Sequence, residues 1–112
     1  MHLVILIPAY NEQNTIANVI RSIPDTISGI SNRTVLVVDD GSEDRTADQA
    51  RSAGVDQVLL HSWNKGLAET FRTGRTEALK RDVDIFVTLD SDGQYDSREI
   101  ASLVQPILEG HA

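Results

Sequence analysis

The chain has 112 residues, of which 40% are hydrophobic, and this is the length of one small domain. Acidic residues outnumber basic ones by 17 to 10, and a formal net charge of -7 without any lysine- or arginine-rich block argues against nucleic acid as a partner. Because cysteine is absent, disulfides, thiolate metal sites and cysteine nucleophiles are excluded, and a reducing compartment such as the cytoplasm is favoured.

Four short runs rich in valine, isoleucine and leucine predict four strands. They lie at residues 3–7, 34–38, 57–60 and 85–89. Apolar runs without polar alternation are typical of strands that are covered on both faces. The first run stops at Pro8, so it is too short to span a bilayer and is predicted to be a strand like the others.

Helical patterns occupy the segments between these runs. The first helix is predicted to end before Pro24 and to bury one face, made by Ile16, Val19, Ile20 and Ile23. A second helix is predicted at residues 43–53, because Ser42 is a suitable N-cap and Gly54 a suitable residue just beyond the end.

Two further helices are predicted in the second half of the chain. The third is expected to bury a face made by Leu67, Phe71, Gly74 and Ala78, with the glycine allowing a close approach to the sheet. The fourth is predicted to begin near residues 96–97 and to extend to about residue 107. It contains Pro106, which cannot donate a backbone hydrogen bond, so a kink or break is expected at residues 102–106.

Strands that alternate with helices predict right-handed crossovers and a mostly parallel sheet. In such sheets the ligand crevice lies at the carboxyl ends of the strands, where the strand order reverses. Polar residues follow three of the predicted strands, at positions 8–12, 39–42 and 90–94. Carboxylates gathered there would repel one another by roughly 4 kcal/mol per close pair, so a cation is expected nearby. Their hard oxygens suit Mg²⁺ or Mn²⁺ better than zinc.

Each acidic pair also has a structural interpretation. Asp90 and Asp92 have the spacing of a turn followed by a helix cap, and the pair at 39–40 precedes a glycine and a serine, which favours a turn. The functional interpretation of the pair at 39–40 is that one of its carboxylates accepts hydrogen bonds from a nucleobase. Asp82 and Asp84 repeat the Asp-x-Asp spacing but precede the fourth strand, so they are predicted to be solvated turn residues away from the crevice.

Other side chains near the predicted crevice have two interpretations each. Pro8 and Tyr10 could form a wall beside a base, or Tyr10 could cover the rim of the core. Lys65, at the start of the third helix, could approach a pyrophosphate, or it could be a solvated lysine. The three histidines share no metal-binding spacing and are predicted to be structural or exposed.

Four motifs, taken in order, resemble those of inverting family 2 glycosyltransferases of the GT-A fold. They are residues 8–12 (Pro-Ala-Tyr-Asn-Glu), 37–42 (Val-Val-Asp-Asp-Gly-Ser), 64–67 (Asn-Lys-Gly-Leu) and 90–94 (Asp-Ser-Asp-Gly-Gln). The pattern is most similar to dolichyl-phosphate mannosyltransferases and glucosyltransferases. The resemblance covers essentially all 112 residues. It implies a Rossmann-like α/β sheet in the order 3-2-1-4 with helices on both faces, the nucleotide-sugar-binding half of a GT-A fold.

The resemblance implies a role for each matched residue. The nucleoside would be lined by Pro8, Tyr10 and Glu12, with Val38 and Asp40 at the base. Further nucleotide-sugar-binding residues would be Lys65 and Ser91. A divalent ion, Mg²⁺ or Mn²⁺, would be held on the diphosphate of a UDP- or GDP-sugar by Asp90, Asp92 and Gln94.

Family members continue into an acceptor-binding half, so the resemblance implies hexose transfer to an acceptor such as polyprenyl or dolichyl phosphate. No catalytic base is assigned within this chain, and association with a membrane is implied for the full-length family. The alternatives are a non-catalytic nucleotide-binding module and a receiver-type Mg²⁺-binding signalling domain. The fourth predicted strand would be an apolar sheet edge without charge or proline, so we expect a two-fold dimer through it.

Overall fold

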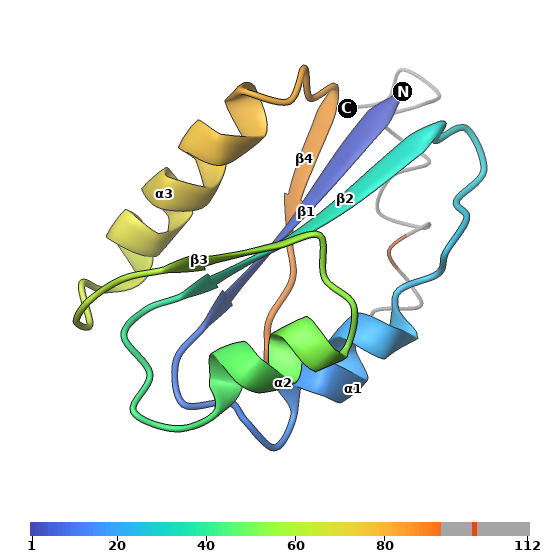
Figure 1. Cartoon of the computed structure of the whole chain (residues 1–112). Helices are drawn as coiled ribbons and strands as arrows, with labels where there is room; N and C mark the ends of the chain where they lie inside the picture. The colour runs from blue at the N-terminus through green and yellow to red at the C-terminus, as the bar shows by residue number, and fades with distance from the viewer. Residues whose placement is uncertain (93–99, 101–112) are drawn as a thin grey trace.

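The computed structural model describes residues 1–92 and residue 100. In this part of the chain the strands are β1 (His2–Ala9), β2 (Asn32–Asp39), β3 (Gln57–Leu60) and β4 (Ile85–Thr88). The helices are α1 (Ile16–Ser22), α2 (Thr46–Ser52) and α3 (Leu67–Leu79). The four strands are parallel and adjacent in the order β3-β2-β1-β4 (Figure 1). The predicted α/β class and strand order are confirmed.

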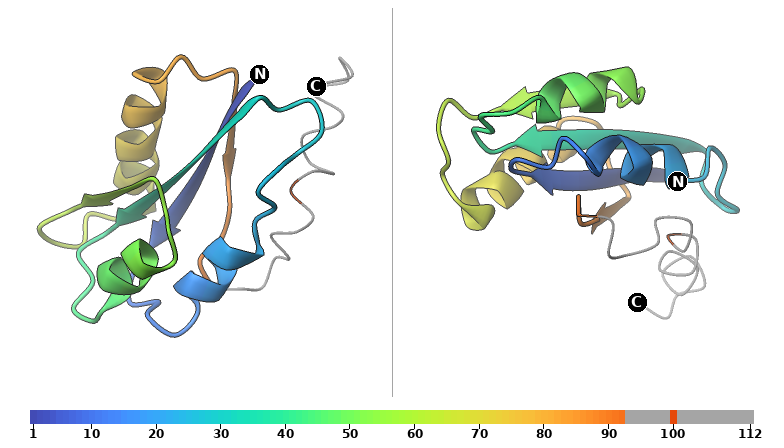
Figure 2. Two further views of the ribbon diagram at one scale, coloured as in Figure 1. Left: turned by 45° about the vertical axis from the view of Figure 1, so that its right-hand side comes forward. Right: turned by 90° about the horizontal axis from the view of Figure 1, so that it is seen from below.

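The central strand β1 supplies side chains to two cores, one on each face of the sheet. Leu3, Ile5 and Ile7 belong to the core that includes residues of α1 and α2, whereas Val4 and Leu6 pack with Ala78 of α3. Figure 2 shows α1 and α2 on one face and α3 on the other. All five of these β1 side chains are 0% exposed, and each contributes roughly 1.5–3 kcal/mol through burial. This two-sided burial explains why the strand has no polar alternation.

The second helix begins later than the sequence predicts, so the N-cap prediction for Ser42 is wrong. Arg45 occupies the N-cap position of α2 and makes no side-chain capping bond. Ser42 instead accepts a hydrogen bond from the backbone N–H of Asn11, at 2.8 Å. Asp44 Oδ1 accepts the N–H of Thr46 at 3.0 Å and so stabilises the first turn in place of a serine cap. Ser42 thus bonds to the loop after β1 and does not cap α2.

The buried stripe of α3 also differs from the predicted face. It consists of Thr70, Gly74 and Ala78, whereas Leu67 is 71% exposed and Phe71 is 43% exposed. Sequence pattern favoured the apolar side chains, but Thr70 can be buried at low cost. Its hydroxyl donates a hydrogen bond to the carbonyl of Gly66 at 2.9 Å, so no polar group is left unpaired.

Gly74 lies where α3 approaches the sheet closely, as predicted. A Cβ atom there would lie 2.5 Å from Cδ1 of Leu6, closer than any carbon contact allows. The first helix follows its prediction too, since α1 ends at Ser22 and Pro24 follows.

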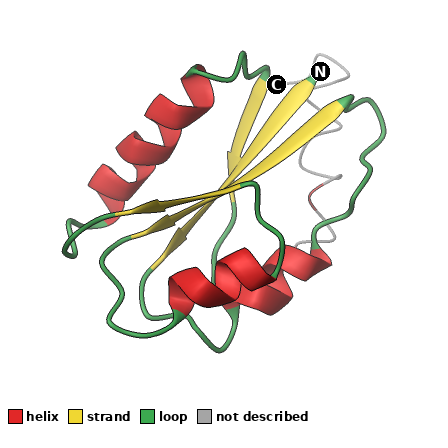
Figure 3. Cartoon of the chain, viewed as in Figure 1, coloured by secondary structure: helices red, strands yellow, loops and turns green. Residues whose placement is uncertain are grey.

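The strand order reverses between β1 and β4, and the two strands separate there. Pairing with β4 stops at Leu6, opposite Thr88, whereas pairing with β2 continues to Ala9, opposite Asp39. Pro8 therefore follows the last pairing with β4, where its missing N–H breaks no bond to that strand. The strands point to one side of the sheet (Figure 3), so the loops after β1, β2 and β4 meet at this opening.

Two predictions concern residues near the end of the chain. The kink expected at residues 102–106 and the predicted metal ligand Gln94 lie outside the described residues. Ile100, in the predicted fourth helix, is helical and 0% exposed. Across residues 1–92 and 100, no helix has both the length and the apolar character needed to cross a bilayer.

Candidate functional site

A cleft of about 430 Å³ lies at the carboxyl ends of the strands. Three loops and the start of α3 enclose it, and its walls come from residues far apart in the sequence. The residues lining it are Pro8, Ala9, Tyr10, Glu12, Asp40, Asn64, Gly66, Leu67, Thr70, Asp90, Ser91 and Asp92. The volume lies within the range of small-molecule sites, and the cleft opens where the strand order reverses.

Most of the predicted site residues meet in this cleft. The predicted residues among its walls are Pro8, Tyr10, Glu12, Asp40, Asp90, Ser91 and Asp92. Tyr10 is 44% exposed and lines the cleft, so part of it is accessible to a ligand. Asp82 and Asp84 precede β4 at the opposite end of the sheet, as expected. There Asp84 accepts the backbone N–H of His2 at 2.7 Å, so its carboxylate has a structural role in addition to being solvated.

The loops after β1 and β2 hold each other through reciprocal hydrogen bonds. The N–H of Asn11 donates to the Ser42 hydroxyl at 2.8 Å, and the Asn11 side-chain oxygen accepts the N–H of Glu43 at 2.9 Å. The N–H of Glu12 donates to the Thr46 hydroxyl at 2.9 Å. These bonds give each loop backbone a fixed partner, so the cleft wall is built before any ligand arrives.

The acidic loop after β4 is held against the loop after β1 by Thr15. The Thr15 hydroxyl lies 2.7 Å from the carbonyl oxygen of Ser91 and 3.0 Å from Glu12 Oε2. Ser91 is 7% exposed, whereas Asp90 and Asp92 on either side of it are exposed and line the cleft. The two aspartates are therefore accessible at the cleft, whereas the serine between them is buried and tied to Thr15.

The donor atoms on this side of the cleft fit a hard divalent cation. Asp90 and Asp92 supply carboxylate oxygens, and Glu12 faces the same cleft from the loop after β1. Within residues 1–92 and 100, no three acidic or histidine side chains converge closely enough to hold a metal alone. Mg²⁺ and Mn²⁺ usually take one or two carboxylates and complete their shell with water and substrate phosphates, which matches this sparse donor set.

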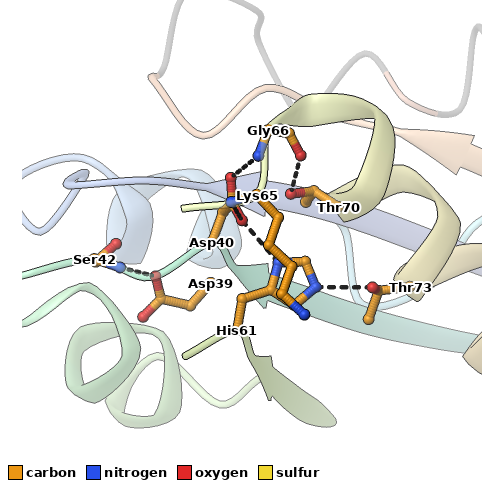
Figure 4. Close-up of polar contacts among 8 residues, drawn as sticks. All are labelled: Asp39, Asp40, Ser42, His61, Lys65, Gly66, Thr70 and Thr73. Atoms are coloured by element: carbon orange, nitrogen blue, oxygen red, sulfur yellow. Dashed lines mark hydrogen bonds and ion pairs between the residues drawn. The ribbon is translucent and has the colours of Figure 1, made fainter. Parts of the chain in front are cut away.

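Asp40 is buried at the floor of the cleft, and its carboxylate is held by three donors (Figure 4). Oδ1 accepts from His61 Nδ1 at 2.7 Å and from the N–H of Lys65 at 2.8 Å, and Oδ2 accepts the N–H of Gly66 at 2.9 Å. Burial by itself raises the pKa of Asp40, but these hydrogen bonds outweigh it and hold the pKa below its usual value. The group is therefore an anion at neutral pH.

The structure corrects the roles expected for two residues. Val38 is 0% exposed and packs with Leu6 and Leu36, so it cannot touch a base without opening the core. The side chain of Lys65 does not line the cleft, because its Nζ lies 4.6 Å from the ring centroid of Trp63 in a cation–π contact. The backbone N–H of Lys65 donates a hydrogen bond to Asp40.

The sequence interpretation identified the motif at residues 64–67 but gave a role there only to Lys65, and it assigned no role to His61. Asn64, Gly66 and Leu67 line the cleft, and His61 lies beneath it against Asp40. His61 directly follows β3 at the carboxyl edge of the sheet, so the rule applied to the other three strands would have identified it. Gly41 allows the approach of the segment after β3: with φ at 76°, Gly41 lies against the backbone of Trp63, where an added Cβ would be 2.4 Å from the carbonyl carbon.

Comparison with known proteins agrees with this geometry. Residues 4–112 match the family model described as glycosyl transferase family 2. The chain is 31% identical to a dolichol-phosphate mannosyltransferase of Pyrococcus furiosus, with 98% of this chain and 31% of that protein aligned. It is 30% identical to a UDP-N-acetylglucosamine–dolichyl-phosphate N-acetylglucosaminyltransferase of Methanococcus voltae, with 93% and 46% aligned.

Solved structures give the same result. Glucosyl-3-phosphoglycerate synthase of Mycobacterium tuberculosis superimposes with a TM-score of 0.78 at 28% identity, over 97% of this chain and 41% of that one. That enzyme has also been crystallised with Mn²⁺ and UDP-glucose. The chain thus spans less than half the length of each of these relatives. Since the family model covers nearly the whole chain, this protein belongs to glycosyl transferase family 2.

Proposed function

We propose that this chain forms the donor-binding part of an inverting, metal-dependent glycosyltransferase that transfers a hexose from a nucleotide-diphosphate sugar. One observation carries the proposal: a single cleft joins the exposed Tyr10, the anionic Asp40 and the acidic pair Asp90 and Asp92. A nucleotide sugar has a base, a diphosphate and a sugar in line, and this cleft offers an aromatic surface and a buried acceptor to the base and a cation site to the diphosphate.

The base would lie beside Pro8 and Tyr10, with Asp40 as the hydrogen-bond acceptor. A carboxylate has about four lone-pair directions, and protein donors use three of those on Asp40. Oδ2 has a single donor, so it retains the capacity to accept one N–H from a base. UDP and GDP both carry such a group, and the choice between them is an outcome of the binding experiment below.

The diphosphate would lie toward Asp90 and Asp92, with Gln94 as a further ligand of the cation. When bound there, Mg²⁺ or Mn²⁺ would neutralise the charge that develops on the leaving diphosphate. The carboxylates hold and orient the donor in this scheme, and neither forms a bond to the sugar. An inverting transfer needs no covalent nucleophile on the protein, and the acceptor itself attacks the anomeric carbon.

The proposed acceptor is a polyprenyl phosphate, as the names of the two archaeal relatives suggest for those proteins. A second hollow of about 670 Å³ adjoins the cleft and shares Pro8, Leu67 and Asp90 with it. Its other walls include the apolar Phe71 and the basic Arg72 and Arg75. Apolar walls with cationic side chains suit an isoprenoid chain that ends in a phosphate. Transfer of the sugar to a lipid acceptor would place the whole protein at a membrane surface.

We also propose that copies associate through the free edge of β4. Among the described residues β4 is an end strand of the sheet, and it has neither charge nor proline. Such an edge is available for pairing with a second copy, and a two-fold contact would close the assembly.

Isothermal titration calorimetry of the chain with UDP and GDP, each with Mn²⁺ or with EDTA, tests the function. We expect one of the two nucleotides to bind, and to bind only with the metal. Equal affinity in EDTA would contradict metal dependence, and no binding of either nucleotide would overturn the proposal. In a transfer assay with a nucleotide sugar and polyprenyl phosphate, turnover would exclude the non-catalytic alternative, whereas binding without turnover is compatible both with a donor-binding part and with that alternative. A receiver domain is excluded by the family membership, and its acidic pair would follow β1 rather than β2.

A further inference from the structure

His61 is a buried titratable side chain that the proposed chemistry does not use. It follows β3 directly, and its side chain is 6% exposed. Nδ1 lies 2.7 Å from Asp40 Oδ1, and Nε2 lies 2.8 Å from the Thr73 hydroxyl in α3 (Figure 4). The ring thus joins three segments: the loop after β2, the end of β3 and the middle of α3.

The Asp40 carboxylate determines which ring nitrogen carries the proton. An ionised carboxylate can only accept hydrogen bonds, so Nδ1 must donate to it. The pKa of Asp40 is held below its usual value, so the group stays ionised at neutral pH. In the neutral ring Nε2 is then the acceptor, and the Thr73 hydroxyl donates to it. Asp40 and Thr73 thereby specify one tautomer and one ring orientation.

The bond from His61 in turn determines how the Asp40 carboxylate is oriented. With Oδ1 anchored by the imidazole, both oxygens face the backbone N–H groups of Lys65 and Gly66. Gly66 has φ at 96° and is the N-cap of α3, and its carbonyl accepts the Thr70 hydroxyl. Asn64 and Leu67, which flank the turn at residues 65–66, line the cleft together with Gly66. His61 therefore fixes the turn that forms one wall of the nucleotide site.

We infer that His61 is a positioning residue of the nucleotide site, which acts through Asp40 by aiming its carboxylate at the 65–66 turn and keeping Oδ2 directed to the cleft. The inference rests on the proposed binding of a nucleotide in this cleft. A merely structural histidine would stabilise the fold without affecting nucleotide affinity beyond the loss of folded protein.

The chain offers a matched control in His2, which makes a similar pair of bonds at the opposite end of the sheet. His2 Nδ1 lies 2.8 Å from the carbonyl oxygen of Arg81, and Nε2 lies 2.8 Å from the Thr34 hydroxyl. Like His61, it bridges distant segments and contacts a threonine. Among the described residues, none of its hydrogen-bond partners lines the cleft. Equal substitutions at the two positions therefore separate a loss of stability from a loss of positioning.

Two substitutions at His61 keep one bond each. The amide nitrogen of asparagine is as far from Cβ as Nδ1, and that of glutamine as far as Nε2. His61→Asn thus keeps a donor for Asp40, whereas His61→Gln keeps only the contact with Thr73. In titrations of UDP and GDP with Mn²⁺, we expect His61→Gln to weaken binding by about tenfold, and His61→Asn to remain within about threefold of the unsubstituted chain. His2→Gln should lower the melting temperature without changing affinity.

Two measurements need no bound nucleotide and so distinguish failure of this inference from failure of the proposed function. Nitrogen-15 shifts of the imidazole in the unsubstituted chain should show the proton on Nδ1 of His61; a proton on Nε2 alone would overturn the inference. Hydrogen exchange at the Lys65 and Gly66 amides should accelerate in His61→Gln but not in His2→Gln. Equal exchange in both variants, or equal affinity of His61→Gln and His61→Asn, would also overturn it. If the unsubstituted chain binds neither nucleotide, the proposed function fails, whatever the exchange rates show.

Discussion

Two segments of this chain have the same Asp-x-Asp spacing and lie at opposite ends of the same strand. Asp82 and Asp84 precede β4, where Asp84 accepts a backbone N–H from His2. Asp90 and Asp92 follow β4 and line the cleft with Tyr10 and Asp40. Spacing alone therefore does not identify a site in an α/β sheet. The ligand cleft lies at the carboxyl edge, where β1 and β4 separate, so the same two carboxylates gain different partners.

Two glycines with left-handed backbones extend the comparison and give the largest expected effect. Gly41, beside the cleft, has φ at 76°, and an added Cβ would lie 2.4 Å from the Trp63 carbonyl carbon. Gly54, before β3, has φ at 89° with open space around it. We expect Gly54→Ala to lower the free energy of unfolding by about 1–2 kcal/mol and Gly41→Ala by about 3 kcal/mol or more. Urea denaturation measures both, and equal losses would contradict the crowding at Gly41.

The acidic pairs themselves give the next effect. Asp92→Asn should weaken Mn²⁺-supported nucleotide binding by at least about tenfold, or roughly 1.4 kcal/mol, because a neutral amide is a poorer ligand of a hard cation. Asp82→Asn is the matched control and should leave the affinity unchanged. Calorimetry in Mn²⁺ and in EDTA measures the difference. A large loss in Asp82→Asn would show that the two ends of the sheet are not as distinct as the structure indicates.

Acid should destabilise the carboxyl edge through Asp40 and Asp44. Burial raises the pKa of both groups, but hydrogen bonds to Asp40 and those to Asp44 from Thr46 and Gln13 outweigh it, so both pKa values are lowered from the usual value of an aspartate. A carboxyl group whose pKa is lower in the folded chain than in the unfolded chain stabilises the fold at pH values above its unfolded-state pKa. This stabilisation is lost as the pH falls through the folded-state pKa. Stability should thus be nearly constant above about pH 5 and fall below about pH 4.

Urea denaturation across this pH range checks that expectation. The acid-induced loss should be smaller in Asp44→Asn than in the unsubstituted chain, because one of the linked protonation events is removed. An equal loss in both chains would contradict a role for Asp44.

The smallest expected effect concerns the association of copies through the edge of β4. Thr88 is exposed at the end of β4, whereas Val87 is partly buried against the core, so a lysine at 88 tests the edge without disturbing the packing. If copies pair through β4, Thr88→Lys should lower the average mass in light scattering at high micromolar concentration, with a melting temperature close to that of the unsubstituted chain. A monomeric mass for both chains would contradict the dimer.

Hydrophobic pattern predicted the elements well where packing follows it on both faces of the sheet. The run at residues 3–7 is buried in β1, and Gly74 approaches Leu6 as expected. The pattern failed where a polar side chain is satisfied locally. Thr70 is buried in place of Leu67 because its hydroxyl bonds to the preceding turn, and Ser42 does not cap α2 because it bonds to the loop after β1.

The sequence by itself determined the parallel α/β class, the strand order through a family resemblance, and the cleft residues that directly follow β1, β2 and β4. These depend on chain order and on the rule that parallel strands end at one edge. Only the tertiary structure decided that Val38 is enclosed in the core, that Lys65 lies over Trp63, and that His61 supports Asp40. Each of those outcomes depends on contacts between residues that the sequence separates, and no local pattern encodes which distant partner a side chain will meet.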